Sequence, residues 1–393
     1  MLPDGWRLTN TGQECYSIVP GRNKPKEFLG SIPWITTPEI SGRYLPSHLQ
    51  KNYISRHTIK EAGAKIVPEG GVVMSAVGDL GLVAIATEEV TLNQQLHAFI
   101  CKKDIDNEFL AYSIETQKPF MERVASKTTI PYLNKANCES IPIILPPLPE
   151  QKKIAAILST WDRAIEGTEK LLANSQQQKK ALMQQLLTGK KRLPGFSGEW
   201  KSHTLSELAV MSSGGTPLST QKAYFGGNIP WVSIADMTRC GKYISQTEKT
   251  LTESGLDNSS AKLYPKNTVL YAMYASIGEC SIASTELSCS QAILGIRTNS
   301  KLYFEYLYFY LSFLKEKIKL LGQTGTQSNL NAKMVKAFGI NLPPLPEQKA
   351  IAAVLTTADE EITPLESDLS RLRQEKKALM QQLLTGKRRV TVD

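Results

Sequence analysis

Apolar residues recur at alternating steps of four and three along two stretches of this 393-residue chain. The first stretch runs from Ile154 to Leu186 and the second from Ile351 to Leu383. A narrow apolar seam held over more than four heptads is typical of a coiled coil. The alternative is that each seam is the buried face of a helix in an ordinary domain. Two seams of equal length favour pairing of the two helices with each other.

Both stretches carry the sequence signals of a helix start and a helix end. Pro149 and Pro346 suit a first helical position, and Gly189 and Gly386 suit the stop. At ~1.5 Å per residue, a helix of roughly 40 residues is about 60 Å long.

Gly167 and Pro364 occupy equivalent positions inside the two predicted helices. The heptad phase continues through both residues. We therefore expect a local kink at each position and not a break into two helices.

The two helical stretches are copies of one another. Leu-Pro-Pro-Leu-Pro-Glu-Gln stands at 145–151 and again at 342–348, and Leu-Leu-Thr-Gly-Lys stands at 186–190 and again at 383–387. Each pair is 197 residues apart. The first helix ends only about a dozen residues before the next globular segment, a link too short to travel back along a 60 Å rod. We therefore predict an antiparallel pair with a globular domain at each end.

The segments outside the helices also repeat. Ile229-Pro-Trp231 follows Ile32-Pro-Trp34 at the same spacing of 197, and both segments contain short runs rich in valine and isoleucine, separated by turns. The predicted class is α+β, with two α/β domains related by the internal repeat and separated by two long helices that form an antiparallel coiled coil. The predicted order is a domain at 1–144, a helix at 145–188, a linker at 189–199, a domain at 200–341, a helix at 342–386 and a basic tail at 387–393.

Composition narrows the class of protein. Hydrophobic residues make up 41% of the chain, enough for real cores, and the formal net charge is +9. A basic chain favours an anionic partner, of which nucleic acid is the common one. The sequence contains no 18-residue apolar run and its first residues do not resemble a signal peptide, so we expect a soluble cytoplasmic protein. The six cysteines form no C-x-x-C pair and the four histidines are scattered, so neither a disulfide framework nor a zinc site is expected.

Three further motifs complete a resemblance that covers the whole chain. They are Leu-Pro-Gly-Phe-Ser-Gly-Glu-Trp at 193–200, Ser-Gly-Gly-Thr-Pro at 213–217 and Gly-Thr-Gln-Ser-Asn-Leu at 325–330. Together with the repeated helix motifs, they make the chain similar to the specificity (S) subunit of type I restriction-modification enzymes.

The resemblance implies a DNA-recognition subunit without chemistry of its own. Each target-recognition domain would read one half of a bipartite site in double-stranded DNA. The helices would set the spacing and dock two adenine methyltransferase (M) subunits, and restriction-translocase (R) subunits would join that core. The alternatives are a self-standing DNA-binding protein and a coiled-coil scaffold. A neighbouring methyltransferase gene would distinguish the resemblance from both.

The residues agree with an absence of catalysis. The chain has no G-x-x-x-x-G-K-[ST] phosphate loop, and Asn341-Leu-Pro-Pro344 does not match the Asn/Asp-Pro-Pro-aromatic motif of adenine methyltransferases. Glu150-Gln-Lys152 resembles a nuclease Glu-x-Lys, but it recurs at 347–349 at a second helix start, which favours helix capping. We expect no catalytic residue, cofactor or metal.

Candidate DNA contacts are basic and polar residues of loops, because Lys and Arg bind phosphates while Arg, Lys, Asn, Gln, Ser and Thr read base edges. The first domain lacks Gly-Gly-Thr-Pro, and Lys127-Thr-Thr-Ile130 stands where Gly-Thr-Gln is expected. Trp34 and Trp231 are predicted to lie in the cores. The candidates are Arg22, Lys24, Lys26, Arg43, Lys127, Thr128 and Thr129 in the first domain, and Thr216, Lys222, Arg239, Lys242, Thr326, Gln327 and Asn329 in the second.

Overall fold

The computed structural model describes residues 2–21, 23–323 and 330–392, without the side chains of 316, 317 and 319–323. The chain divides into two compact units. The first unit is Met1–Glu169 with Ser367–Asp393, and the second is Lys170–Glu366. Each unit therefore holds one globular domain and one half of each long helix.

The two long helices are α6 (Leu148–Leu186) and α12 (Leu345–Leu383). The globular part of the first unit contains β1 (Arg7–Asn10), α1 (Thr11–Glu14), β2 (Cys15–Ile18), β3 (Ile32–Ile35), η1 (Thr37–Glu39), β4 (Tyr44–Leu45), β5 (Tyr53–Ile54), α2 (Arg56–Ala62), β6 (Ile66–Val67), β7 (Val72–Ser75), β8 (Val83–Ala86), β9 (Val90–Leu92), β10 (Leu96–Cys101), α3 (Asn107–Glu115), α4 (Lys118–Val124), α5 (Lys135–Glu139) and β11 (Pro142–Leu145).

The globular part of the second unit contains β12 (Lys201–Thr204), α7 (Leu205–Leu208), β13 (Ala209–Ser213), η2 (Lys222–Tyr224), β14 (Phe225–Val232), α8 (Ile234–Cys240), β15 (Tyr243–Ile244), β16 (Lys249–Leu251), α9 (Glu253–Asp257), β17 (Val269–Ala272), β18 (Cys280–Ala283), β19 (Ser288–Cys289), β20 (Ile293–Thr298), α10 (Phe304–Gln323), α11 (Ala332–Lys336) and β21 (Gly339–Leu342).

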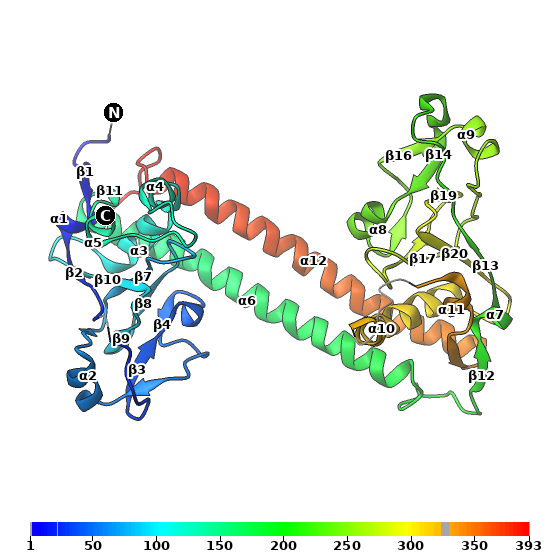
Figure 1. Cartoon of the computed structure of the whole chain (residues 1–393), viewed down its shortest axis with the longest axis horizontal. Helices are drawn as coiled ribbons and strands as arrows, with labels where there is room; N and C mark the ends of the chain where they lie inside the picture. Colours follow the sequence, from blue (N-terminus) through cyan, green and yellow to red (C-terminus); the bar gives the residue numbers. More distant parts are fainter. Residues whose placement is uncertain (1, 22, 324–329, 393) are drawn as a thin grey trace. The chain divides into compact units, whose positions relative to one another are not determined.

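A five-stranded sheet in the order β2-β10-β7-β8-β4 forms the centre of the first domain (Figure 1). One face, including Met74 and Phe99, shares a core with α3 and the long helices. The other face, including Val73 and Ala98, packs against β3, β6 and β9 of a smaller sheet ordered β5-β3-β9-β6. Because both faces are covered, β7 and β8 are apolar along nearly their whole length and do not alternate with polar residues.

The second domain repeats this plan. Its five-stranded sheet is ordered β13-β20-β17-β18-β15 and its smaller sheet β16-β14-β19. Tyr271 and Ile296 face the core shared with α10 and the long helices, whereas Leu270 and Ile293 face the core shared with the smaller sheet. Trp34 and Trp231 are buried in the smaller sheets, which confirms their predicted packing.

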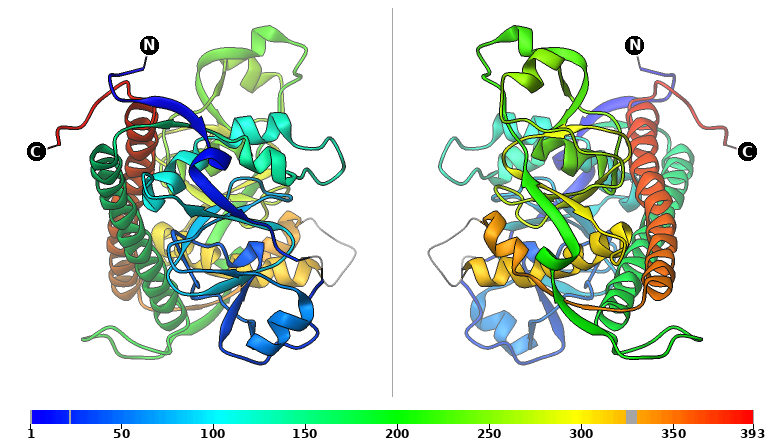
Figure 2. Two further views of the ribbon diagram at one scale, coloured as in Figure 1. Left: turned by 90° about the vertical axis from the view of Figure 1, so that its left-hand side faces the viewer. Right: turned by 90° about the vertical axis from the view of Figure 1, so that its right-hand side faces the viewer.

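The long helices pair in antiparallel fashion within each unit, as predicted. In the first unit Glu169 of α6 binds Arg373 of α12 at 2.6 Å, while Asp162, earlier in α6, binds Lys376, later in α12. The second unit shows the reverse halves in contact, with an ion pair between Lys179 and Asp359. Figure 2 shows α6 and α12 side by side. Both helices continue through Gly167 and Pro364.

The repeated Glu-Gln of the helix starts joins each helix to its domain. Gln151 donates to the carbonyl oxygens of Asp104 and Pro146 at 3.0 and 2.9 Å and accepts from the Asp106 amide at 2.8 Å. Gln348 makes the same three contacts in the second unit. The amide side chain thus closes the turn before the helix, because it satisfies backbone groups that the turn leaves unpaired.

Glu150 departs from the expected role of helix capping. Its carboxylate accepts from the indole Nε1 of Trp6 at 3.2 Å and pairs with Arg389 near the other end of the chain. Glu347 likewise accepts from Trp200 at 3.2 Å and from Arg192. These buried carboxylates bind side chains that arrive from distant parts of the sequence, so they hold the helix starts through tertiary contacts.

The two helix ends are also equivalent. Gly189 and Gly386 both adopt positive φ after the last turn, as predicted for a helix stop. A Cβ on Gly189 would lie 3.4 Å from the ring of Trp200, and one on Gly386 would lie 2.8 Å from Pro3 and 3.2 Å from Trp6. In the second unit one continuous linker joins these partners. In the first unit the same place is filled by the two ends of the chain.

Candidate nucleic-acid interface

Four of the predicted contacts lie in one loop of each domain. Lys24 and Lys26 lie between β2 and β3, and Thr216 and Lys222 lie between β13 and β14. All four residues are exposed. Each loop leads from an edge strand of the five-stranded sheet to the smaller sheet, so the two loops occupy equivalent places in the repeated fold.

The Gly-Gly-Thr-Pro motif builds the second of these loops. The Gly214 and Gly215 amides donate to the carbonyl oxygens of Ile293 and Cys289, both at 2.9 Å, and Trp231 Nε1 donates to the Gly215 carbonyl at 2.9 Å. A Cβ on Gly214 would lie 2.1 Å from the Cys289 oxygen. Only glycine fits this close backbone approach. The next residue, Thr216, is thereby presented to solvent from an anchored backbone.

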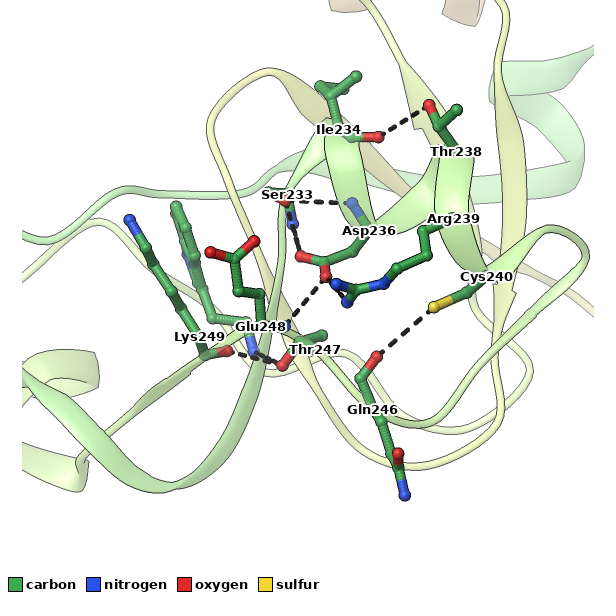
Figure 3. A network of polar contacts seen from close by, with 11 residues as sticks. Ser233, Ile234, Asp236, Thr238, Arg239, Cys240, Gln246, Thr247, Glu248 and Lys249 are labelled. Atoms are coloured by element: carbon green, nitrogen blue, oxygen red, sulfur yellow. Dashed lines mark hydrogen bonds and ion pairs between the residues drawn. The ribbon is translucent and has the colours of Figure 1, made fainter. Parts of the chain in front are cut away.

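A buried acid organises the turn after β3 in the first domain and after β14 in the second, and Figure 3 shows the turn of the second domain. Asp236 accepts from the amide and hydroxyl of Ser233 at 3.0 and 2.7 Å and from the Glu248 amide at 3.0 Å. Glu39, 197 residues earlier, accepts from Thr36 and from the Lys51 amide in the same way. Burial raises the pKa of Asp236, but hydrogen bonds from Ser233 and Glu248 outweigh it, and the pKa is lowered overall.

In the second domain, the buried Asp236 also holds the side chain of Arg239 in place. Its guanidinium pairs with Asp236, while the side chain remains 57% exposed. The first domain has two residues fewer between its buried acid and the next strand, so Arg239 has no direct counterpart there. An arginine held on one side by a buried carboxylate keeps free N–H groups for a phosphate or a guanine edge.

Lys127, Thr128 and Thr129 lie between α4 and α5 and are exposed. The Thr128 hydroxyl donates to the Ile130 carbonyl at 2.8 Å and lies 3.1 Å from the Ser126 hydroxyl. Thr128 therefore shapes the turn, whereas Lys127 and Thr129 remain the better placed for an external contact.

Arg43 does not fit the predicted role. Its side chain is only 10% exposed, and the guanidinium pairs with Glu115 at 2.8 Å and Asp162 at 3.3 Å and stacks 4.0 Å from the Tyr112 ring. Burial lowers the pKa of Arg43, but the two carboxylates outweigh it and raise the pKa overall. Its charge is used to hold the domain on α6, so we remove it from the candidate DNA contacts.

Lys242 is removed for the same reason. It precedes β15 as Arg43 precedes β4, is 13% exposed, and donates to Thr356 of α12 at 2.7 Å. It also lies 4.7 Å from the centre of the Phe309 ring. Burial lowers the pKa of Lys242, although the neighbouring Glu305 opposes that shift. Both Arg43 and Lys242 were expected to be exposed because they lie in loops, but the side chains of both are largely buried.

Four candidates, Arg22, Thr326, Gln327 and Asn329, lie outside the described residues. Within the described ranges, the structure contains no cluster of three or more His, Cys, Asp or Glu side chains that could hold a metal ion. In that same part of the chain, no helix is both long and apolar enough to cross a membrane.

The comparisons with known proteins agree on one family. A family model described as the type I restriction modification DNA specificity domain matches residues 20–174 and again residues 197–371. The chain therefore belongs to the family of type I restriction-modification specificity proteins.

Individual relatives match over most of the chain. A type I restriction enzyme MjaVIII specificity subunit from Methanocaldococcus jannaschii is 26% identical, with 99% of this chain and 94% of the relative covered. The EcoR124I/EcoR124II specificity subunit from Escherichia coli is 27% identical over 58% of this chain and 57% of its own. A solved S subunit from M. genitalium has the same fold, with a TM-score of 0.64, 15% identity and 98% of each chain covered.

Proposed function

We propose that this chain is the DNA-recognition subunit of a type I restriction-modification complex and performs no catalysis itself. Each domain reads one half of a bipartite site in double-stranded DNA. The paired helices set the spacing between the halves and dock the two methyltransferase subunits, to which restriction-translocase subunits are added. One relative that matches nearly the full length is named a specificity subunit of such an enzyme. A subunit of this kind works in the cytoplasm.

The observation that carries this proposal is an internally repeated scaffold with different loops. The helix starts, the buried acids and the sheet order recur in both domains. The loops between β2 and β3 and between β13 and β14 share little sequence. Two copies of one frame that carry different surfaces are suited to reading two different sequences, because base readout depends on the side chains in the loops.

The candidate contacts divide by role. Lys24, Lys26, Lys127 and Lys222 are exposed cations suited to phosphates, since each offers a point charge without fixed direction. Thr216 and Arg239 are held by anchored backbone or by a buried carboxylate and are suited to base edges. Arg22, Thr129, Thr326, Gln327 and Asn329 remain candidates from the sequence alone.

The test is to co-express the chain with its neighbouring methyltransferase subunit and to map methylated adenines across the host genome. The expected result is methylation at a split motif with a fixed gap. A chain with Arg239→Ala should relax or lose only one half of that motif. A stable complex that methylates no split motif, or an intact chain that binds DNA specifically without any methyltransferase, would contradict the proposal.

A further inference from the structure

Two cysteines face each other across the edge of the first domain's five-stranded sheet. Cys15 of β2 and Cys101 of β10 are paired in antiparallel register. The hydrogen bond beside them joins the Lys102 amide to the Glu14 carbonyl at 3.0 Å, so the cysteines form a non-hydrogen-bonded pair. In such a pair the Cα atoms lie about 4.5 Å apart and both side chains point to the same face. That separation falls within the range of roughly 4.4–6.8 Å found for disulfides.

The two sulfur atoms differ in access. Cys15 is buried in the core, and a hydrogen bond to Cys101 together with burial raises the pKa of its thiol. Cys101 is partly exposed and lines a cavity of about 350 Å³ together with Lys102, Lys103 and Lys152. A small oxidant therefore reaches the sulfur of Cys101 before the buried sulfur of Cys15.

We propose that Cys15 and Cys101 form an oxidation site that closes a reversible disulfide between β2 and β10 when the chain meets a peroxide. The Cys101 thiol attacks one oxygen of hydrogen peroxide, which gives a sulfenic acid and one water. The Cys15 thiol then attacks that sulfur and displaces the hydroxyl as a second water. Two thiols and one peroxide thus become one disulfide and two waters.

The rest of the chain supplies the controls. Cys138, Cys280 and Cys289 are buried, and Cys240 belongs to another element. In the second domain Ala209 and Thr298 hold the paired positions of β13 and β20 that correspond to Cys15 and Cys101. Cys15→Ala and Cys101→Thr therefore introduce residues that this fold already accepts at the equivalent place.

The disulfide would act on an edge strand. β2 has a neighbour on one side only, β10, and its exposed Tyr16 is next to Cys15. The strand leads into the loop that carries Lys24 and Lys26. A covalent tie at its start would keep β2 on the sheet, and the closed loop of roughly 90 residues would raise the melting temperature of the first unit by about 5 °C or more.

The experiment treats the full-length chain with hydrogen peroxide, quenches it, blocks free thiols and maps linked peptides by mass spectrometry without reduction. We expect one linked pair, Cys15 with Cys101, that dithiothreitol reverses, and slower amide exchange in β2 while it is closed. Cys15→Ala and Cys101→Thr should both remove the link and its thermal shift. The proposal is overturned if Cys101 is oxidised in the folded chain with no link to Cys15, or if links to the other cysteines form equally well.

Discussion

Two aspartates of the long helices stand in equivalent places with unequal partners, and this predicts opposite effects for two reciprocal substitutions. Asp162 accepts from the Tyr112 hydroxyl at 2.5 Å and pairs with Lys376 and Arg43. Asp359 pairs with Lys179, but Phe309 replaces the tyrosine. Among the described residues, the Asp359 Oδ2 atom is buried and has no hydrogen-bond partner. Tyr112→Phe should therefore destabilise the chain, whereas Phe309→Tyr should stabilise it.

The magnitudes follow from the partners that remain. A hydrogen bond to a charged group contributes about 1.5–3 kcal/mol when buried. Asp162 is partly exposed and keeps two cations after Tyr112→Phe, so the loss should be about 1–2 kcal/mol. Phe309→Tyr gains about 1 kcal/mol, because burial of the new hydroxyl offsets part of the bond. For units of roughly 200 residues, each kcal/mol shifts the melting temperature by about 2–4 °C.

Calorimetry of the full-length chain measures both effects. The matched control is Asp162→Asn, in which the carboxylate charge is absent. Tyr112→Phe should cost clearly less in that background, because the substitution then removes a hydrogen bond to a neutral amide. If Tyr112→Phe destabilises the chain equally in both backgrounds, the effect does not come from the hydrogen bond between Tyr112 and the Asp162 carboxylate. A lower melting temperature for Phe309→Tyr would show that Asp359 does not need the missing donor.

The same pair gives a pH dependence. Burial raises the pKa of Asp162, but hydrogen bonds from Lys376 and Tyr112 outweigh it and lower the pKa overall. A carboxyl whose pKa is lower in the folded state stabilises the protein above its unfolded pKa of about 4 and loses that contribution as the pH falls further. The difference in melting temperature between the wild-type chain and Tyr112→Phe should therefore shrink below about pH 4. A difference that stays constant down to pH 2 would contradict this account.

Three further predictions concern the helices and the recognition loops. Glu347→Gln should lower the melting temperature more than Glu150→Gln, because Arg192, the partner of Glu347, is less exposed than Arg389, the partner of Glu150. Equal shifts in melting temperature would contradict this. Leu369→Asp places a charge in the buried seam of α12 and should destabilise the chain by about 3 kcal/mol, and an unchanged melt would refute the seam. Insertion of four residues, about one turn, at the same level of both helices should lengthen the gap in the recognised DNA, measured by mapping of methylated sites, and an unchanged gap would refute the helices as the spacer.

Much of the architecture could be predicted because its signals are local or repeated. The heptad seam can be recognised within a few turns of sequence. Both long helices and their pairing could therefore be predicted from the spacing of leucine and isoleucine. The offset of 197 linked both long helices and the inner strands to their copies, whereas β1, α1 and β2 recur at an offset of 194. Pro149 and Gly189 marked helix ends through conformational preferences that do not depend on the remainder of the fold.

The burial and the partners of individual polar residues could not be predicted, because they depend on residues far away in the sequence. Arg43 is buried because Asp162, 119 residues later, approaches it. Glu150 binds Arg389, 239 residues later, although its position in a first turn suggested capping. The repeat did contain a usable signal, because Lys179 and Asp162 recur as Lys376 and Asp359. Opposite charges that recur in or beside an apolar seam indicate ion pairs.

The packing of Gly386 on Pro3 and Trp6 has an evolutionary consequence. The linker from Gly189 to Trp200 and the meeting point of the two chain ends do the same structural work, one with a continuous backbone and one without. A gene half this long would encode one domain and one helix, and two such products could assemble head to tail with both junctions open. Fusion of two copies would close one junction and release each half to acquire its own mutations. The linker would then be the trace of that fusion.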